Sequence, residues 1–318
     1  MTCEAERFTA ANIPPLRGYV VIVTGGNAGI GYETALQLAR HDARVYIASR
    51  SEARVMEAIA KMRRVQASVD VHFLKLDLQD LNSVKAAAAE FERRETRLDI
   101  LINNAGIMAC PYEHTKDGHE VQWQTCFLAH HAFTLSLLPM MRQTAQQRGS
   151  ARAGVRIVNV SSDAALFMGP DTIQYDDTNL SGVTGSLAPW RRYSHCKKAS
   201  IIAAKAINTR YDKYGIAAYS LHPGVIKTGL QAHDTSFLGT ITRVTMKLTP
   251  TSTVEEGARN SLFVATSPLV TDHGGKFYGP VGKLNHRAEK LTSDPKTADM
   301  LWDLADRQLR DHGFAFDH

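Results

Sequence analysis

The amino-acid sequence predicts an α/β protein with a mostly parallel sheet and helices on both faces. Short apolar runs alternate with longer segments of helical periodicity along most of the 318 residues. The apolar run Val20-Val21-Ile22-Val23 leads directly into glycines at positions 25, 29 and 31, and a helical pattern follows. A strand, a glycine turn and a helix in this order place free N–H groups and a helix dipole where they favour a phosphate.

The predicted elements follow one another in strict alternation. Strands are expected near 19–24, 44–48, 71–76, 98–102, 155–160, 216–221 and 276–279, and helices near 29–41, 52–66, 84–91, 118–145, 190–214, 252–266 and 295–311. Such alternation is typical of parallel crossover units, so we expect a single doubly wound Rossmann fold.

The domain organisation is simple. Residues 1–17 are expected to form an N-terminal arm, and residues 18–318 a single domain without a linker. Segments 163–190 and 229–250 show no clear period, so we expect substrate loops there.

Composition excludes several other classes of protein. Hydrophobic residues make up 44% of the chain, charged residues 22%, and the net charge is +5, with no basic run that would predict a nucleic-acid surface. The four cysteines at positions 3, 110, 126 and 196 form no C-x-x-C pair, which favours free thiols over disulfides or a metal site. No signal peptide or membrane span is recognisable, so we expect a cytoplasmic protein.

Residues that follow the strands are the candidates for chemistry, because ligands of such sheets bind at the carboxyl ends of the strands. Ser49-Arg50 follows the second strand, where an NAD site usually has an acidic residue. A guanidinium matches a 2′-phosphate, so Arg50 favours NADP(H); a solvated arginine at a helix start is the alternative.

Tyr193 and Lys197 form the strongest catalytic candidate. At a spacing of four on a helix they share one face, and the lysine charge should lower the pKa of the phenol. Ser162, shortly after the fifth strand, can hydrogen-bond a substrate carbonyl. Tyr112 and Lys116 have the same spacing but lie in a segment that reads as a loop, so we exclude them.

Together these motifs resemble the short-chain dehydrogenase/reductase family. The resemblance rests on Thr24-Gly25-x-x-x-Gly29-Ile30-Gly31, Asn103-Asn104-Ala105-Gly106, Ser162, Tyr193-x-x-x-Lys197 and Pro223-Gly224, in order, and covers about residues 17–280. Within the family the chain is most similar to the retinol-dehydrogenase-like and fungal secondary-metabolism branches.

The resemblance implies a site and a reaction. A hydride passes between a nicotinamide and a carbonyl or alcohol carbon; Tyr193 is the general acid/base, Lys197 lowers its pKa and holds the ribose, and Ser162 orients the substrate oxygen. A homodimer or homotetramer is also implied. The residues expected to bind the cofactor are Gly25, Asn27, Gly29, Ile30, Gly31, Ser49, Arg50, Asp77, Leu78, Asn103, Asn104, Ala105, Gly106, Tyr193, Lys197, Pro223, Gly224, Ile226 and Thr228.

One position departs from the family pattern. Cys126 stands where the family has an asparagine that bends the helix and anchors a water leading to the lysine. A thiol is a poor hydrogen-bonding partner, so either the proton relay is impaired or the chemistry has changed, or the backbone carbonyl alone keeps the water and the thiol is tolerated.

The substrate is expected to be lipophilic. Apolar side chains flank the site, namely Leu166, Phe167, Met168, Trp190, Phe237, Leu238, Met246 and Leu248. The prediction is thus an NADP(H)-dependent carbonyl/alcohol oxidoreductase, with a role in secondary metabolism. The alternatives are a non-redox cyclase, isomerase or dehydratase on the same scaffold, and a cofactor-binding protein with impaired redox chemistry.

Overall fold

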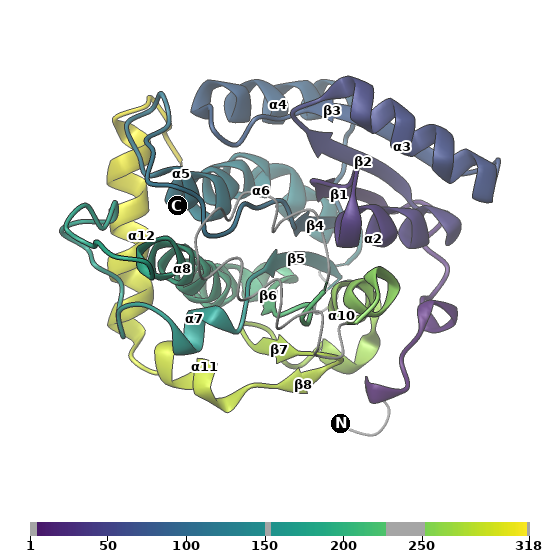
Figure 1. Cartoon of the computed structure of the whole chain (residues 1–318). Coiled ribbons are helices and arrows are strands. Elements are labelled where there is room, and N and C mark those ends of the chain that lie inside the picture. The colour runs from purple at the N-terminus through teal and green to yellow at the C-terminus, as the bar shows by residue number, and fades with distance from the viewer. Residues whose placement is uncertain (1–4, 150–153, 227–251, 317–318) are drawn as a thin grey trace.

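The sheet forms the centre of the molecule (Figure 1). A computed structural model describes residues 5–149, 154–226 and 252–316 of the chain. Eight strands lie in the order β3-β2-β1-β4-β5-β6-β7-β8. They are β1 (Val20–Thr24), β2 (Arg44–Ser49), β3 (Asp70–Lys75), β4 (Ile100–Asn103), β5 (Val155–Val160), β6 (Ile216–Leu221), β7 (Phe277–Gly279) and β8 (Lys283–Leu284). Neighbouring strands are parallel except β7 and β8, which confirms the predicted fold class.

Helices cover both faces of the sheet. The longer ones are α2 (Gly29–Arg40), α3 (Glu52–Val65), α4 (Leu81–Arg94), α6 (Ala129–Gln147), α8 (Ala188–Tyr211), α10 (Val254–Thr266) and α12 (Pro295–Arg310). Side chains of α4, α6, α8 and α12 form one apolar cluster with one face of the sheet. Side chains of α2, α3 and α10 form a second cluster with the other face. Two cores on opposite faces are what a doubly wound sheet requires.

Local sequence explains where several helices begin. The Ser51 side chain accepts a hydrogen bond from the third residue of its helix, and Asp80 caps α4 in the same manner through Asn82. Thr253 and Glu256 form a reciprocal capping box at the start of α10. Each cap satisfies an N–H group that the helix itself leaves without a partner.

The register brings the predicted site residues to one edge. Val23 pairs with Ile47 of β2 on one side and with Ile102 of β4 on the other. The chain therefore leaves β1, β2 and β4 at the same edge of the sheet. The order of the strands reverses between β1 and β4, and such a switch point is where doubly wound sheets bind ligands.

Two element predictions were wrong in detail. The helix expected over 118–145 begins at α5 (Val121–Trp123), continues through a π-helical turn, η2 (Gln124–Leu128), and only then becomes α6. The segment expected to be a loop over 163–190 contains α7 (Ala164–Phe167) and the start of α8.

The short strand β8 and the short helix α11 (His286–Leu291) were not predicted. The 3-10 turns η1 (Ala10–Asn12), η3 (Asp212–Tyr214) and η5 (Pro268–Val270) were not predicted either. All of these elements are too short to show a hydrophobic period. The Asn285 side chain caps α11 at Arg287, which was the available signal.

The N-terminal segment packs against the domain. Ala5 and Phe8 are buried in the cluster that includes α10, and the Arg259 guanidinium donates to the carbonyl of Phe8 at 2.8 Å. Figure 1 shows this segment beside α10. Residues 5–17 therefore contribute to the core even though they precede the first strand.

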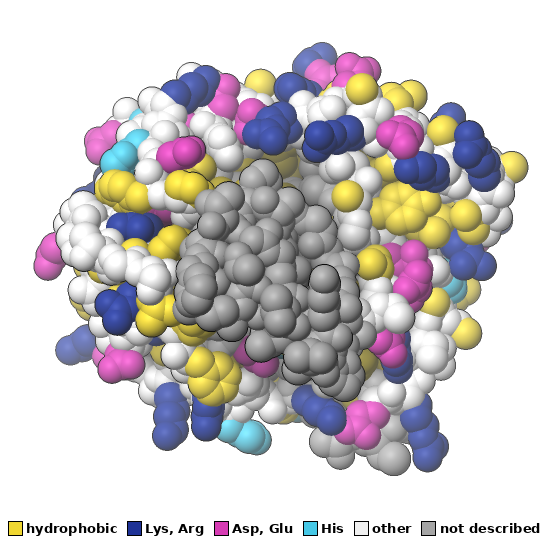
Figure 2. Space-filling model, viewed as in Figure 1, with side chains coloured by type: hydrophobic (Ala, Val, Ile, Leu, Met, Phe, Trp, Pro, Cys, Tyr) yellow, Lys and Arg dark blue, Asp and Glu magenta, His cyan; other side chains and the backbone are white. Residues whose placement is uncertain are grey.

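The surface in Figure 2 mixes charges of both signs. Lys and Arg side chains alternate there with Asp and Glu, and no continuous basic region forms among the described residues of this face. No helix within 5–149, 154–226 and 252–316 has both the length and the apolar character needed to cross a bilayer.

Asp99 is a buried carboxylate that joins three parts of the fold. It accepts hydrogen bonds from the backbone N–H of Val20 at 2.8 Å, from Arg97 at 2.7 Å and from Arg148 at 2.6 Å. These contacts tie the start of β1 to the start of β4 and to the end of α6. Because Asp99 is fully buried, its charge depends on these partners.

Replacing Asp99 with alanine should destabilise the protein. It would leave the buried N–H of Val20 and two arginines without their acceptor, so we expect the free energy of unfolding to fall by about 3 kcal/mol. Denaturant unfolding measures this change. Asp70→Ala is the matched control: its ion pair with Arg44 is half exposed, so a loss below about 1 kcal/mol is expected. Equal losses in both variants would contradict the buried role of Asp99.

Candidate active site

Two adjoining cavities lie at the carboxyl edge of the sheet. One, of about 280 Å³, is lined by residues that include Gly29, Tyr193 and Lys197. The other, of about 210 Å³, is lined by residues that include Ser49 and Arg50. Both are bordered by the same four residues, Gly25, Ala105, Gly106 and Ile107, so they form one elongated cleft over the ends of β1, β2 and β4.

The glycine turn forms the floor of the cleft. Gly25 and Gly29 have φ angles of 66° and 55°, in the region that favours glycine. Gly31 has no room for a side chain, since a Cβ there would lie 2.4 Å from Asn104 Nδ2 and 2.5 Å from the carbonyl oxygen of Gly25. The turn is therefore packed directly against the loop that follows β4.

The N-terminus of α2 borders the cleft, and no side chain caps its backbone N–H groups. Its N-cap residue, Ala28, makes no side-chain hydrogen bond to the helix, and the first turn contains no acidic residue. Ala28, Gly29, Ile30 and Gly31 all line the cavity. Backbone N–H groups and the helix dipole at this position fit an anionic group such as a pyrophosphate.

The other end of the cleft carries two arginines. Arg50 lines the cavity as expected, and Arg54, one helical turn later on α3, lines it too. Arg54 was not predicted, although its spacing of four from Arg50 was a usable signal. Ser49 donates a hydrogen bond to Asn27 Oδ1 at 2.9 Å, which joins two further predicted residues here; Asp77 and Leu78 also line this cavity.

The structure brings Ser162, Tyr193 and Lys197 together. The Ser162 and Tyr193 side chains lie close enough to interact. Lys197 lies one turn after Tyr193 on α8, its Nζ is 5.7 Å from the centre of the phenol ring, and it donates to the carbonyl of Val160 at 2.8 Å. Ser161 holds the helix in place by donating to the carbonyl of Lys197 at 2.7 Å.

The pKa of Tyr193 differs from the expectation that Lys197 lowers it. Burial raises the pKa of Tyr193, and the neighbouring Lys197 lowers it by less, so the net shift is upward. The phenol is therefore held in its protonated form. Burial also opposes the charge of Lys197, but the neighbouring Cys126, Tyr193 and Cys196 outweigh burial and raise its pKa.

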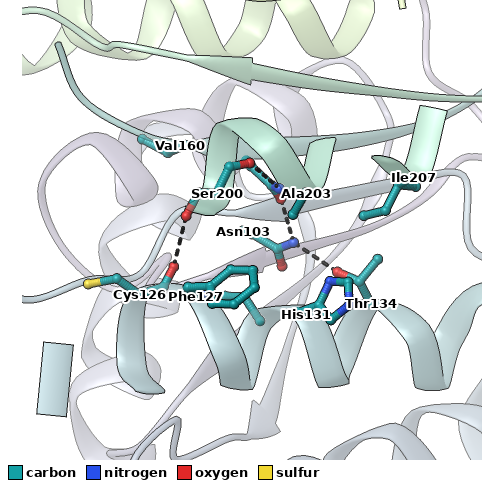
Figure 3. Close-up of a pocket in the computed structure, with 11 residues that line it drawn as sticks. Asn103, Cys126, Phe127, His131, Thr134, Val160, Ser200, Ala203 and Ile207 are labelled. Carbon is teal, nitrogen blue, oxygen red and sulfur yellow. Dashed lines mark hydrogen bonds between the residues drawn. The ribbon is translucent and has the colours of Figure 1, made fainter. Parts of the chain in front are cut away.

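Cys126 is hydrogen-bonded to the backbone of Ile107 and to the side chain of Ser200. Its sulfur accepts a hydrogen bond from the N–H of Ile107 at 3.5 Å and donates one to the carbonyl of the same residue at 3.3 Å. Its own carbonyl accepts from Ser200 Oγ of α8 at 3.2 Å, as Figure 3 shows. Cys126 lies within the π-helical turn, which departs locally from the regular α-helix.

Several predicted residues lie outside the cleft. The amide of Asn103 points beneath it and donates to Thr134 and Asn159, both at 2.9 Å, beside a small cavity of about 10 Å³ (Figure 3). Asn103 therefore ties β4 to α6 and β5, while Asn104 borders the cleft. The sequence could not separate the two, because both follow the same strand.

The loop after β6 contributes less than expected. Pro223 lines the cleft, whereas Gly224 does not, and Ile226 is buried against α10. Thr228 lies outside the described residues, and so do Phe237, Leu238, Met246 and Leu248.

The described apolar residues near the site divide into two groups. Leu166 packs into a small cluster with Ile201, Phe277 and Ala288, so it serves the fold. Phe167 is 63% exposed, and the Trp190 ring lies edge-on to Tyr193 with 6.1 Å between ring centres. Tyr112 lies in a loop, where its ring packs against the Arg192 guanidinium of α8, and Lys116 is paired to Asp80, so this second Tyr/Lys pair has no helix to align it.

Comparison with known proteins shows which family the chain is similar to. Residues 19–178 match the model described as short chain dehydrogenase. The chain is 38% identical over 309 residues to the short-chain dehydrogenase/reductase drtF of Aspergillus calidoustus, which covers 94% of this chain and 96% of that protein. It is 35% identical over 298 residues to retinol dehydrogenase 12 of Homo sapiens, which covers 91% and 86%.

Solved structures agree in fold. An uncharacterized protein from Mycobacterium paratuberculosis superposes with a TM-score of 0.71 at 31% identity, covering 95% of this chain and 97% of that one. The NADPH-bound carbonyl reductase from chicken fatty liver superposes with a TM-score of 0.62 at 24% identity, covering 87% and 97%; this second likeness is one of fold alone.

Gly31→Ala should disturb the floor of the cleft. The added Cβ would overlap Asn104 and the backbone of Gly25, so we expect a loss of about 2 kcal/mol in the free energy of unfolding. Thermal and denaturant unfolding measure it. Gly182→Ala is the control, since nothing lies within 4 Å of a Cβ there, and it should leave stability unchanged. A Gly31→Ala protein as stable as the control would show that the turn is not packed as described.

Proposed function

The chain belongs to the short-chain dehydrogenase/reductase family, and from this premise we propose an NADP(H)-dependent oxidoreductase that interconverts a carbonyl and an alcohol on a lipophilic small molecule. The oxidoreductase class follows from the family. The observation that carries the proposal is the cleft itself, with Ser162, Tyr193 and Lys197 at one end and Arg50 and Arg54 at the other.

The residues of the cleft fit a dinucleotide phosphate. The N-terminus of α2 would hold the pyrophosphate, the two arginines a 2′-phosphate, and Tyr193 and Lys197 the nicotinamide ribose. When bound, the nicotinamide supplies a hydride to a carbonyl carbon or takes one from an alcohol carbon. Ser49-Arg50-Ser51 contains no carboxylate that would repel the phosphate, which favours NADP(H) over NAD(H).

Side chains of the protein bind the substrate oxygen and transfer its proton. In reduction, the Tyr193 hydroxyl donates its proton to the substrate oxygen, while the Ser162 hydroxyl donates a hydrogen bond to the same oxygen. The positive charge of Lys197 stabilises the phenolate that remains. In oxidation, the phenolate accepts the proton of the alcohol.

A lipophilic substrate is supported by apolar side chains that lie between Ser162 and Tyr193 in the chain. Phe167 is exposed and its ring packs against the Arg287 guanidinium, and the Trp190 ring lies edge-on to Tyr193. Retinol, named in one of the relatives, is an alcohol of this kind. A cytoplasmic location fits the three free thiols of the described residues, and a role in secondary metabolism and a homodimer or homotetramer stay predictions.

The non-redox alternative rests on Cys126. Because the thiol retains contacts to both backbone groups of Ile107, the site needs no change of chemistry to accommodate it. Stoichiometric NADPH consumption with substrate would exclude a cyclase, isomerase or dehydratase. Product without any change in nicotinamide absorbance would favour one.

Arg50→Ala should weaken NADPH binding selectively. Loss of charge-assisted hydrogen bonds to the 2′-phosphate predicts a tenfold to hundredfold rise in the dissociation constant, roughly 1.4 to 2.8 kcal/mol, with little effect on NADH. Calorimetry with both cofactors measures the difference. Arg64→Ala, at the other end of α3, is the control and should bind both as the wild type does. Equal losses for NADPH and NADH would contradict the proposed recognition.

Tyr193→Phe should reduce turnover by roughly two to four orders of magnitude, since it removes the proton donor. The readout is NADPH oxidation with a panel of lipophilic aldehydes and ketones. Because burial raises the pKa of Tyr193, wild-type reduction should be independent of pH through neutrality and fall only in alkaline solution, as the phenol loses its proton. Oxidation should rise over the same alkaline range.

Tyr112→Phe is the control for this experiment, because Tyr112 has the same spacing from a lysine but lies in a loop. Its turnover and pH profile should match the wild type. Unchanged turnover of Tyr193→Phe would refute the proposed role. A wild type that binds NADPH but reduces nothing in the panel would favour a cofactor-binding protein with impaired chemistry.

A further inference from the structure

Two buried cysteines lie in contact beside the catalytic lysine. Cys126 comes from the π-helical turn η2 and Cys196 from α8, directly before Lys197. The side chains of the two cysteines interact with each other. Both are free thiols in this structure. Neighbouring thiols form a disulfide when the backbone lets their sulfur atoms approach each other.

The backbones of the two residues are joined as well. Ser200 Oγ lies 3.2 Å from the carbonyl oxygen of Cys126 and 3.0 Å from that of Cys196. One hydroxyl therefore spans both segments and holds them at a short separation. Figure 3 shows Ser200 reaching the backbone of Cys126, whose sulfur points away from the small cavity.

The sulfur of Cys126 lies directly beneath the wall of the cleft. A Cβ on Gly106 would be 3.5 Å from Cys126 Sγ and 3.5 Å from Lys197 Nζ. Gly106 borders both parts of the cleft and has no side chain to cover the sulfur. A small oxidant in the cleft is thus separated from the thiol by a single layer of atoms.

The surroundings shift the pKa values of the two thiols in opposite directions. The neighbouring Cys196 side chain and the charge of Lys197 lower the pKa of Cys126 despite its burial. Burial and the neighbouring Cys126 raise the pKa of Cys196. Cys126 Sγ is also the sulfur that lies beneath Gly106 at the wall of the cleft, so Cys126 is assigned as the nucleophile of the pair and Cys196 as the resolving thiol.

We propose that Cys126 and Cys196 are a redox-active dithiol that a hydroperoxide converts into a disulfide, and that this disulfide switches the site off. The Cys126 thiolate attacks one peroxide oxygen, the O–O bond breaks, and the departing hydroxide takes a proton to become water. The Cys196 sulfur then displaces the hydroxyl of the sulfenic acid, and the thiol proton leaves with it as a second water. Both sulfurs are oxidised and the peroxide is reduced; a thiol reductant reverses the change.

The disulfide would disturb groups that line the cleft. Cys126 would lose the proton that it donates to the carbonyl of Ile107, and Cys196 the one that it donates to the carbonyl of Tyr193 at 3.0 Å. Ile107 borders both cavities, and Tyr193 is the proposed proton donor. The loss of turnover therefore rests on the proposed function, whereas formation of the disulfide does not.

The test uses the full chain, reduced, freed of reductant and treated with hydrogen peroxide. Non-reducing peptide mass spectrometry should find the Cys126 and Cys196 peptides linked, with a loss of two hydrogens. NADPH-dependent turnover should fall at least tenfold and return with dithiothreitol. In Cys196→Ser the link should be absent, and dimedone should trap a sulfenic acid on Cys126.

Cys110→Ser is the control, because Cys110 is also buried but is hydrogen-bonded to the carbonyl of Met108 at 3.7 Å. It should form the same link as the wild type. A link from Cys126 to Cys110 or Cys3, or thiols that stay reduced while surface methionines oxidise, would overturn the proposal. A disulfide that leaves turnover intact would overturn the switch. A protein that links Cys126 to Cys196 but never turns over NADPH would instead refute the proposed function alone.

Discussion

The hydroxyl of Thr24 is the contact on which the cleft depends. Its oxygen accepts hydrogen bonds from the backbone N–H groups of Asn104 and Ala105, both at 2.9 Å, and lies 2.9 Å from Nε2 of His130. One side chain at the end of β1 thereby joins the loop after β4 to the helix that follows η2. Burial lowers the pKa of His130 to about 3, so the ring that contacts the hydroxyl is neutral.

Backbone contacts explain how the site accommodates a thiol at position 126. Ser200 of α8 donates a hydrogen bond to the Cys126 carbonyl, and the Cys126 thiol contacts both the N–H and the carbonyl of Ile107. The position is therefore set mainly by backbone contacts, which a thiol can share. What the thiol adds is redox chemistry, beside a buried lysine whose charge favours the thiolate.

The fold could be predicted from the sequence because strands and helices are encoded by patterns of neighbouring residues. Buried strands such as β1 read as continuous β-branched runs, and helices such as α3 carry their own caps. It failed at α7, β8 and α11, which are too short to show a period, and at η2, where the bend depends on tertiary contacts. Asn103 and Asn104 could not be separated, since the pleat of β4 and the packing of α6 decide which amide faces the cleft.

The order of residues predicts the α/β class, the order of the elements, the glycine turn and the candidate residues Ser162, Tyr193 and Lys197, because spacing along one strand or helix encodes them. Packing alone places Arg54 beside Arg50, makes burial outweigh Lys197 in raising the pKa of Tyr193, and brings the side chains of Cys126 and Cys196 together. Burial and contacts between distant segments depend on how the layers pack. No local pattern of residues carries that information.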